Sequence, residues 1–287
     1  MRWLITGASG FLGANAVRVL SPSHDVVGLV RDVNTAPWCD QKITADLLAV
    51  DALERAVHEV EPDVVLHCAG MANHRACEAD EDLATRVNAQ ASGVLAGAAA
   101  ARGAAFVYVS TDAVFSGARG WYEENEAVSP NTAYGRTKAA GEEAVLNAHA
   151  SAVVARTNFF GWSPSGHAST LEFFVRELGA GNRVPGFVDY TVTSLFVEDV
   201  VESIERIVGS GESGIFHVVA RDAVSKFEFG RLVAAEFGLD ESLIYESSVE
   251  GRPKDLSLRS DRLSGLLGSA MPSQAEGLAC ARTSRRF

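Results

Sequence analysis

Short apolar runs alternate with longer stretches of helical periodicity along the first part of the chain. The run at 63–68 contains Val64, Val65 and Leu66 without a polar interruption, which is typical of a strand buried on both faces. The expected strands are 2–6, 25–30, 42–44, 63–68, 105–110 and 153–156, and the expected helices are 11–20, 49–60, 80–102 and 133–149. Apolar strands that are each followed by a helix predict a Rossmann-type α/β fold with a doubly wound parallel sheet.

The pattern loosens after about residue 157, where glycines and prolines interrupt it. Further helices are expected at 169–178, 198–208 and 226–237, with a strand at 215–219. We therefore expect a cofactor-binding domain over 1–157 and a smaller, irregular α/β substrate module over 158–287, packed on the strand ends of the first domain, where ligands bind in such folds. The segment after Gly268 has little periodicity, and we expect it to lie loosely on the surface.

Composition narrows the class of protein. The chain has 287 residues, 47% of them hydrophobic, and a formal net charge of -12. An acidic protein repels phosphate backbones and anionic lipid, so nucleic acid and membrane surfaces are not expected partners. The four cysteines form no CxxC pair and no Cys/His cluster has zinc-ligand spacing, so we expect reduced thiols and no metal. We find no signal peptide and no transmembrane-length apolar run, and we expect a cytoplasmic protein.

A glycine-rich turn reads Thr-Gly-Ala-Ser-Gly-Phe-Leu-Gly at 6–13, between the first strand and the first helix. Gly7 permits the tight turn, Gly10 lets the backbone approach a pyrophosphate, and Gly13 allows close helix–strand packing. The turn therefore predicts a dinucleotide site, with the exposed amides of the helix start facing the phosphates.

The residues after the second and third strands bear on which dinucleotide is bound. Arg31 follows the second strand at the place where a ribose contact is expected, and an arginine there tolerates the 2′-phosphate of NADP. Asp32 keeps NAD open, and a solvated surface arginine is the structural alternative for Arg31. Asp46, which precedes Leu47, is a candidate acceptor for the adenine amino group, and a helix N-cap explains it equally well.

Candidate catalytic residues occur in two places. Tyr134 and Lys138 are four residues apart, so they share one helix face, and an ammonium beside a phenol favours the phenolate and lowers its pKa. Tyr134 is then a usable proton donor to a carbonyl. Lys138 is also a candidate to bind the nicotinamide ribose. Ser110 and Thr111 close an apolar strand at the carboxyl edge of the sheet, where Thr111 would hold the substrate oxygen beside Tyr134.

Together these motifs resemble the extended short-chain dehydrogenase/reductase family. The matching features are TGxxGxxG at 6–13, Asp46-Leu47, Leu66-His67-Cys68-Ala69-Gly70, Ser110-Thr111-Asp112 and YxxxK at 134–138. Within the family, segments such as 110–115, 122–125 and 129–142 are similar to the dTDP-4-dehydrorhamnose reductase group, and Arg252-Pro253 followed by Leu256-Ser257-Leu258 extends the likeness.

The resemblance implies a reductase that passes hydride from NADPH or NADH to C4 of a nucleotide-linked 4-keto-6-deoxysugar. It implies Thr111, Tyr134 and Lys138 as the catalytic set. The cofactor residues it implies are Gly7, Ser9, Gly10, Phe11, Leu12, Gly13, Arg31, Asp46, Leu47, Cys68, Ala69, Gly70, Ser110, Tyr134 and Lys138. The substrate residues are Asp112, Ala113, Asn158 and Arg252. A guanidinium suits the nucleotide diphosphate, although Arg252 also fits an ordinary surface loop.

Two departures from the reductase pattern touch the sugar pocket. Ala113 stands where an aromatic residue is usual, and Asn158-Phe159 replaces Ser-Trp. An epimerase with tightly bound NAD would use the same Thr, Tyr and Lys. The regulatory subunit of methionine adenosyltransferase resembles the same group and binds its cofactor without catalysis. Both alternatives, an epimerase and a regulatory subunit without catalysis, stay open at this point.

The resemblance also implies a homodimer. In the family, the helices corresponding to 80–102 and 133–149 pair with a second subunit as a four-helix bundle. Small residues permit such close helix approach, and they fit packing within one subunit equally well; they are Ala89, Ala91, Ala96, Ala139 and Ala140.

Overall fold

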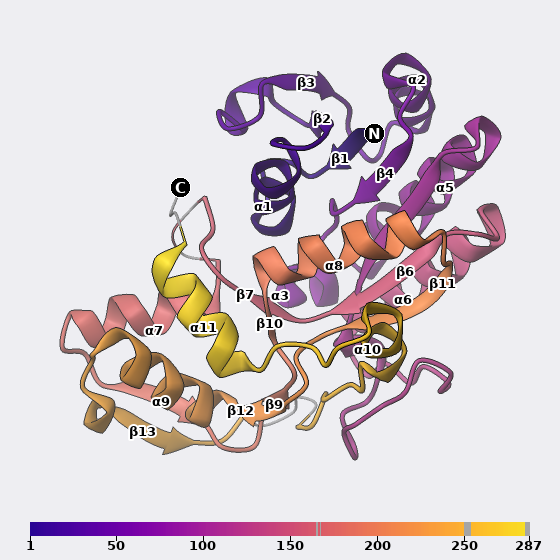
Figure 1. The fold of residues 1–287 in the computed structure, drawn as a ribbon. Helices are drawn as coiled ribbons and strands as arrows, with labels where there is room; N and C mark the ends of the chain where they lie inside the picture. The colour runs from indigo at the N-terminus through magenta and orange to yellow at the C-terminus, as the bar shows by residue number, and fades with distance from the viewer. Residues whose placement is uncertain (165, 167, 250–253, 285–287) are drawn as a thin grey trace.

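A computed structural model describes residues 1–164, 166, 168–249 and 254–284, and its centre is a seven-stranded parallel sheet (Figure 1). The strand order is β11-β6-β5-β4-β1-β2-β3. The strands are β1 (Arg2–Thr6), β2 (Asp25–Val30), β3 (Gln41–Thr44), β4 (Val64–His67), β5 (Ala105–Thr111), β6 (Val153–Thr157) and β11 (Gly214–Val218). The chain runs outward from β1 to β3 and then returns to the other side of β1 as β4. This reversal confirms the expected Rossmann-type α/β architecture and creates a crevice at the carboxyl ends of β1 and β4.

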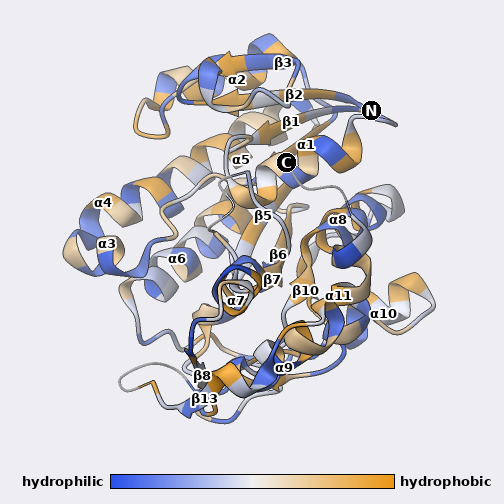
Figure 2. Ribbon diagram, turned by 90° about the vertical axis from the view of Figure 1, so that its left-hand side faces the viewer, coloured by the Kyte–Doolittle hydropathy of each residue, from blue (hydrophilic) through white to orange (hydrophobic). Residues whose placement is uncertain are grey.

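Helices cover both faces of the sheet because consecutive strand residues point to opposite faces. Ile5 packs in one core with Val17 of α1 (Phe11–Leu20) and Val200 of α8 (Val197–Ser210). Leu4, its neighbour in β1, packs in the opposite core, which contains residues of α2 (Val50–Val60), α5 (Ala91–Arg102) and α6 (Ala133–Ala148). Figure 2 shows hydrophobic residues concentrated in the strands between these helical layers.

The helix expected over 80–102 is interrupted. It consists of α4 (Glu81–Thr85), a π-helical turn over Arg86–Gln90 and α5, and a further helix, α3 (His74–Ala79), precedes it. Asn88 lies in the π turn and is buried; its side chain accepts from the Met71 amide at 2.7 Å and donates to the Met71 carbonyl at 3.0 Å. A π turn is a local defect that often marks a functional site, and this one fixes the loop after β4.

The small alanines of these helices pack mainly within the subunit. Ala89, Ala91 and Ala96 are almost fully buried. Ala91 and Ala96 belong to the core between the large sheet and helices α2, α5 and α6. These residues therefore serve the monomer's own packing and give no support to a subunit interface.

The rest of the chain forms a smaller layer below the sheet (Figure 1). It has three two-stranded sheets, β10-β7, β12-β9 and β13-β8. Their strands are β7 (Phe159–Phe160), β8 (Val184–Phe187), β9 (Thr191–Val192), β10 (Leu195–Phe196), β12 (Val224–Ser225) and β13 (Ile244–Ser247), and the helices are α7 (Thr170–Gly179), α9 (Lys226–Phe237) and α10 (Asp261–Leu267). Because β11 joins the large sheet and α8 packs on one of its faces, part of the segment beyond residue 157 belongs to the large sheet and its covering helices.

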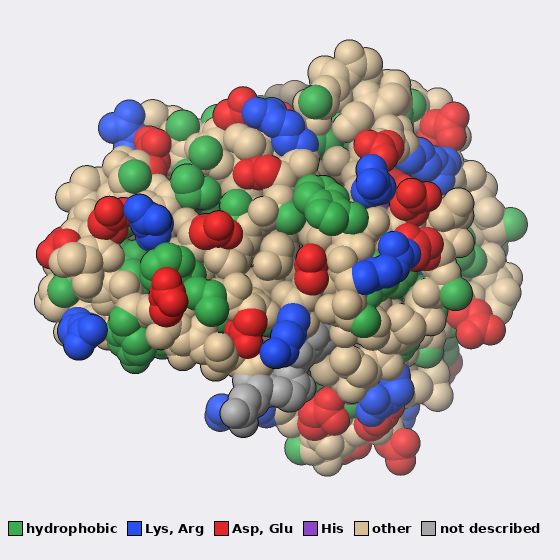
Figure 3. All heavy atoms as spheres, turned by 90° about the horizontal axis from the view of Figure 1, so that it is seen from below, with side chains coloured by type: hydrophobic (Ala, Val, Ile, Leu, Met, Phe, Trp, Pro, Cys, Tyr) green, Lys and Arg blue, Asp and Glu red, His purple; other side chains and the backbone are tan. Residues whose placement is uncertain are grey.

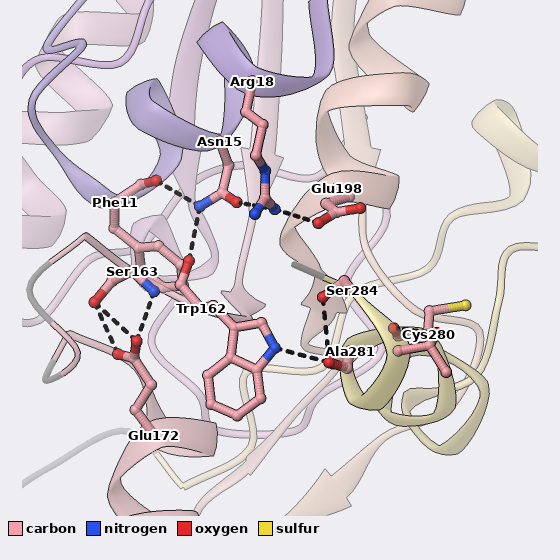
Figure 4. A network of polar contacts seen from close by, with 11 residues as sticks. Phe11, Asn15, Arg18, Trp162, Ser163, Glu172, Glu198, Cys280, Ala281 and Ser284 are labelled. Carbon is pink, nitrogen blue, oxygen red and sulfur yellow. Dashed lines mark hydrogen bonds and ion pairs between the residues drawn. The ribbon is translucent and has the colours of Figure 1, made fainter. Parts of the chain in front are cut away.

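The expectation of a loose tail after Gly268 is wrong. Helix α11 (Gln274–Thr283) begins with a capping box between Ser273 and Glu276, and Leu278 is fully buried. The Trp162 indole nitrogen donates to the Ala281 carbonyl at 2.7 Å, which ties α11 to the segment after β7 (Figure 4). The amphipathic pattern is weak because glycine and alanine form part of the packed face.

Candidate active site

The glycine-rich turn has the geometry that its sequence requires. Gly7 has a φ of +67°, a left-handed conformation that favours glycine. A Cβ at Gly13 would lie 2.2 Å from the Gly7 carbonyl oxygen, so α1 packs against the turn only because residue 13 lacks a side chain. Gly10 precedes the first residue of α1 and points the helix amino terminus at the crevice, which favours an anion.

A crevice of about 510 Å³ opens beside this turn. The expected cofactor residues that line it are Gly7, Ser9, Gly10, Arg31, Asp46, Leu47, Cys68, Ala69 and Gly70. Sequence reasoning missed Leu48, Met71, Leu83 and Val87, which also line it. The spacing of Leu83 and Val87 on one helical face was the signal available for two of them.

Other expected cofactor residues lie around the crevice rather than in its lining. The Phe11 ring packs edge-on against Phe159 with 5.1 Å between centroids, and Leu12 is buried. Ser110 is buried, and its hydroxyl donates to Glu142 at 2.5 Å. The Ser110 side chain is therefore engaged in the interior.

Of the charged residues after β2 and β3, Arg31 and Asp46 line the crevice and Asp32 does not. Asp32 accepts from the Asn34 amide at 2.9 Å and so caps its own loop, whereas Arg31 is exposed and lines the crevice. Asp46 accepts from the Leu48 amide at 2.9 Å, and the residue that caps α2 is Ala49. The helix-cap explanation of Asp46 is therefore wrong, and its carboxylate borders the crevice.

Tyr134 and Thr111 come together at the carboxyl end of β5, where the Thr111 hydroxyl is near enough to lower the pKa of the phenol. The first turn of α6 reaches this point because Gly135 lacks a side chain: a Cβ there would lie 2.1 Å from the Ala113 carbonyl oxygen. Thr132 caps the helix by accepting from the Gly135 amide at 3.1 Å. Catalytic candidates that are distant in sequence are thus brought together by one close backbone approach, between α6 and the segment after β5.

The Tyr134 phenol is kept protonated. Burial raises its pKa to about 12, the Thr111 hydroxyl lowers it, and Asp112 and Cys77 raise it further. The expectation that Lys138 would bring this pKa down toward neutrality is wrong in this structure. A neutral phenol is the form that donates a proton to a carbonyl under reduction.

Lys138 lies one turn after the tyrosine, on the side of α6 that faces β5. Its ammonium donates to the Val109 carbonyl at 2.7 Å and lies 3.8 Å from the centroid of the Tyr108 ring. Burial lowers the pKa of Lys138 to about 7, while Glu142 and Cys68 raise it. The ammonium is therefore bound to the strand and not directed only at the phenol.

A buried ionic cluster that sequence reasoning missed supports this lysine. Glu142, one turn after Lys138, receives two-pronged hydrogen bonds from Arg156, the shortest at 2.7 Å. The Glu142 and Arg156 side chains are 6% and 2% exposed, and Ser110 bonds the same carboxylate. The available signal was Arg156 in an otherwise apolar strand, since a buried charge requires a partner.

The expected substrate residues form a chain of hydrogen bonds next to Thr111. Asp112 accepts from Thr111 at 3.0 Å and from the Asn158 amide at 2.7 Å, and Asn158 accepts from Ser194 at 2.6 Å. Burial raises the pKa of Asp112 to about 6, while Asn158, Thr111 and Lys226 lower it. Ala113 is buried beside them, and Arg252 lies outside the described residues.

In the smaller layer, Asn158 also lines a second cavity of about 430 Å³, which we call the aromatic cavity. Its other lining residues, none of them anticipated, are Ser169, Thr170, Phe173, Phe174, Pro185, Phe187, Tyr190, Lys226 and Val249. An aromatic wall with a few polar groups is typical of a small-molecule site. Asn158 therefore connects the catalytic groups to a cavity able to hold the rest of a substrate.

A link runs from the glycine-rich helix to this cavity (Figure 4). Asn15 of α1 donates to the Trp162 carbonyl at 3.0 Å, and the next residue, Ser163, donates its amide to Glu172 of α7 at 2.6 Å. Glu172 also accepts from the amides of Ala168 and Ser169 at 2.9 and 3.1 Å. The loop that carries part of the cavity lining is therefore fastened to both layers.

The described residues contain no group of three or more histidine, cysteine, aspartate or glutamate side chains placed to hold a metal ion. Within the same residues, no helix has the length and apolar character needed to cross a membrane.

Comparisons with known proteins give a consistent grouping. Residues 1–276 match the family described as RmlD substrate binding domain. A probable low-salt glycan biosynthesis reductase of Haloferax volcanii is 33% identical, with 96% of this chain and 95% of that protein covered. The beta subunit of mouse methionine adenosyltransferase 2 is 31% identical, with 94% and 84% covered. The Bacillus anthracis dTDP-4-dehydrorhamnose reductase, solved with NADP, superposes with a TM-score of 0.88 at 26% identity, covering 98% of each chain.

Proposed function

The chain belongs to the RmlD substrate binding domain family, and on that premise we propose that it is an NADPH-dependent reductase of nucleotide-linked 4-keto-6-deoxysugars. The observation that supports this most strongly is the protonated Tyr134 phenol beside the Thr111 hydroxyl, next to Asp112, which accepts from Asn158 of the second cavity. Such a reaction belongs to deoxysugar biosynthesis.

NADPH, when bound, supplies the hydride. The glycine-rich turn would hold its pyrophosphate, Asp46 its adenine amino group, and Lys138 its nicotinamide ribose. Tyr134 would donate a proton to the sugar O4, and Thr111 would hold that oxygen in place. Preorganised groups of this kind lower the barrier by positioning and proton transfer.

The preference for NADP is supported by Arg31, whose guanidinium lines the crevice while Asp32 is occupied by its own loop. A guanidinium fork suits a 2′-phosphate. The related Bacillus anthracis reductase was solved with NADP, which agrees with this choice.

The substrate contacts are proposed from the chain of polar groups next to Thr111. Asp112 and Asn158 would bind sugar hydroxyls, and Ala113 leaves more space beside the sugar than an aromatic residue would. Arg252 remains a sequence-based candidate for the diphosphate. The four cysteines are unpaired, which suits a reducing cytoplasm. On the face seen in Figure 3, acidic and basic side chains are interspersed, so no basic surface for nucleic acid gathers there.

A homodimer through 80–102 and 133–149 is proposed from the family resemblance alone, because several alanines first considered for the interface are buried in the monomer. Light scattering coupled to gel filtration tests it. A dimer mass at micromolar concentration is expected, and a monomer mass would remove this part of the proposal.

The test of the function is a spectrophotometric screen of NADPH and NADH oxidation with dTDP-, UDP- and GDP-linked 4-keto-6-deoxysugars. Net NADPH oxidation with at least one of them is expected. Interconversion of sugars without net oxidation would indicate an epimerase. Cofactor binding without turnover of any substrate, together with a stable protein partner, would indicate a regulatory role such as that of the methionine adenosyltransferase beta subunit.

A further inference from the structure

The aromatic cavity has one ionised side chain among its described lining residues, that of Lys226. Its neighbours in the lining are aromatic rings, hydroxyl groups and the Asn158 amide. Lys226 is the first residue of α9, and its ammonium lies 3.5 Å from the Thr170 hydroxyl oxygen. The same ammonium lies 6.0 Å and 5.9 Å from the centroids of the Tyr190 and Phe229 rings, on the aromatic side of the cavity.

The Lys226 side chain is partly buried at the cavity wall. Burial lowers the pKa of Lys226 to about 8, and the charge of Asp112 raises it. A desolvated ammonium is stabilised by an anionic ligand more than an exposed one is, because the local dielectric constant is low. The position therefore favours a negatively charged group in the cavity.

The helix that bears Lys226 strengthens the same field. α9 has twelve residues, and its amino-terminal end, with the partial positive charge of aligned peptide dipoles, coincides with the lysine. Glu228 in the first turn is bound by the Ser225 amide and hydroxyl, at 2.8 and 3.0 Å. The Glu228 carboxylate is thus already engaged by the cap, and the other carboxylate that acts on this ammonium, Asp112, is engaged by Thr111 and Asn158.

We propose that Lys226 binds the diphosphate of the nucleotide sugar and so makes this site selective for nucleotide-linked over free sugars. The inference rests on the proposed function. It places the neutral sugar beside Asp112 and Asn158, the diphosphate beside Lys226, and the base against the ring wall formed by residues such as Phe173 and Phe187. In a protein of net charge -12, a local cation of this kind offsets the repulsion that a dianion meets.

The test is calorimetric binding of dTDP and of thymidine to the NADP⁺-saturated enzyme, compared between wild type, Lys226→Met and Lys226→Arg. We expect Lys226→Met to weaken dTDP binding at least tenfold, the usual size of one charge-assisted contact, and to leave thymidine binding unchanged. Lys226→Arg should retain most of the dTDP affinity. Added salt should weaken dTDP binding more in wild type than in Lys226→Met.

The matched control is Lys42→Met, which removes the same charge from β3, where the ammonium donates to the Ala36 carbonyl at 3.1 Å, outside this cavity. It should leave dTDP binding unchanged. Unaltered dTDP affinity in Lys226→Met would overturn the proposal, as would an equal loss for thymidine, which would indicate altered cavity shape. If wild type binds none of dTDP, UDP and GDP, the nucleotide-sugar function itself fails; if it binds one of them, that function stands whatever Lys226 does.

Discussion

The two cavities of the molecule are built in different ways. The crevice of about 510 Å³ lies at the edge of one continuous sheet and is formed largely by turns that follow β1, β2, β3 and β4. The aromatic cavity of about 430 Å³ is formed by side chains of α7, β8, α9 and the loops between them. The shape of the crevice depends on where the backbone turns, which suits a cofactor that stays the same across a family. The shape of the aromatic cavity depends on which side chains meet, which suits a substrate that varies.

The largest effect expected from a single change concerns the buried ion pair between Glu142 and Arg156. Glu142→Ala would leave the Arg156 guanidinium buried without its partner, which costs about 3–5 kcal/mol in the free energy of unfolding. Urea unfolding measures this. Glu241→Ala, which breaks the exposed ion pair with Arg231, is the matched control and should change the free energy far less. Similar small changes in both variants would contradict the cost assigned to leaving Arg156 without its buried partner.

The next largest effect separates chemistry from cofactor binding at Tyr134. Tyr134→Phe removes the proton donor and keeps the ring, so kcat should fall about a hundredfold while NADPH affinity is unchanged. Steady-state kinetics and cofactor titration measure the two quantities. Tyr245→Phe, at an exposed tyrosine of β13, should behave as wild type. Near-normal turnover of Tyr134→Phe would remove the mechanism.

A change confined to the crevice should act on cofactor choice alone. Arg31→Ala is expected to weaken NADPH about tenfold and NADH little, since one charge-assisted contact to the 2′-phosphate is lost. Fluorescence titration with both cofactors measures this. Arg102→Ala, whose guanidinium pairs with Glu61, is the control. Equal losses for NADPH and NADH would reverse the cofactor preference.

A change at Asp112, on the substrate side, should alter the dependence of kcat/KM on pH. Because the pKa of Asp112 is raised to about 6, its carboxylate is ionised above that pH and can accept sugar hydroxyls. We expect kcat/KM to fall severalfold as pH drops through 6, and Asp112→Asn to abolish this limb. An unchanged limb in Asp112→Asn would assign it to another group.

The same shift has an opposite consequence for stability. A carboxyl with a higher pKa in the folded state than in the unfolded state binds more protons when folded, so its contribution to stability falls as pH rises from about 4 to 6. Asp112→Asn should therefore raise the melting temperature more at pH 7 than at pH 4. The reverse order would contradict the buried, ionised carboxylate.

The contrast between the cavities also explains what the sequence could predict. The turn at Gly7, the strand ends at Arg31 and Asp46, and the Thr111–Tyr134 pair follow local patterns whose place in a parallel sheet is fixed by topology. Lys226 and Phe187 could not be assigned in this way, because short strands such as β8 and β13 bring distant segments together without a periodic signal. Helix α11 was missed for a related reason: small residues pack closely without an apolar stripe.

The electrostatics of the site was the other property that the sequence could not predict. Spacing placed Lys138 and Tyr134 on one face of α6. Only the structure shows that the ammonium donates to the Val109 carbonyl and that burial is the largest influence on the pKa of the Tyr134 phenol. The direction of a pKa depends on solvent exclusion by residues that adjoin in space, which no pattern along the chain records.

Transfer of deuterium from NADPH labelled at its reactive C4 position, followed by mass spectrometry of the sugar in a single turnover, tests the central claim most directly. The account predicts one deuterium at C4 of a nucleotide-linked sugar with wild-type protein and a rate about a hundredfold lower with Tyr134→Phe. A reduced sugar without deuterium, or label transfer at the wild-type rate in Tyr134→Phe, would contradict it.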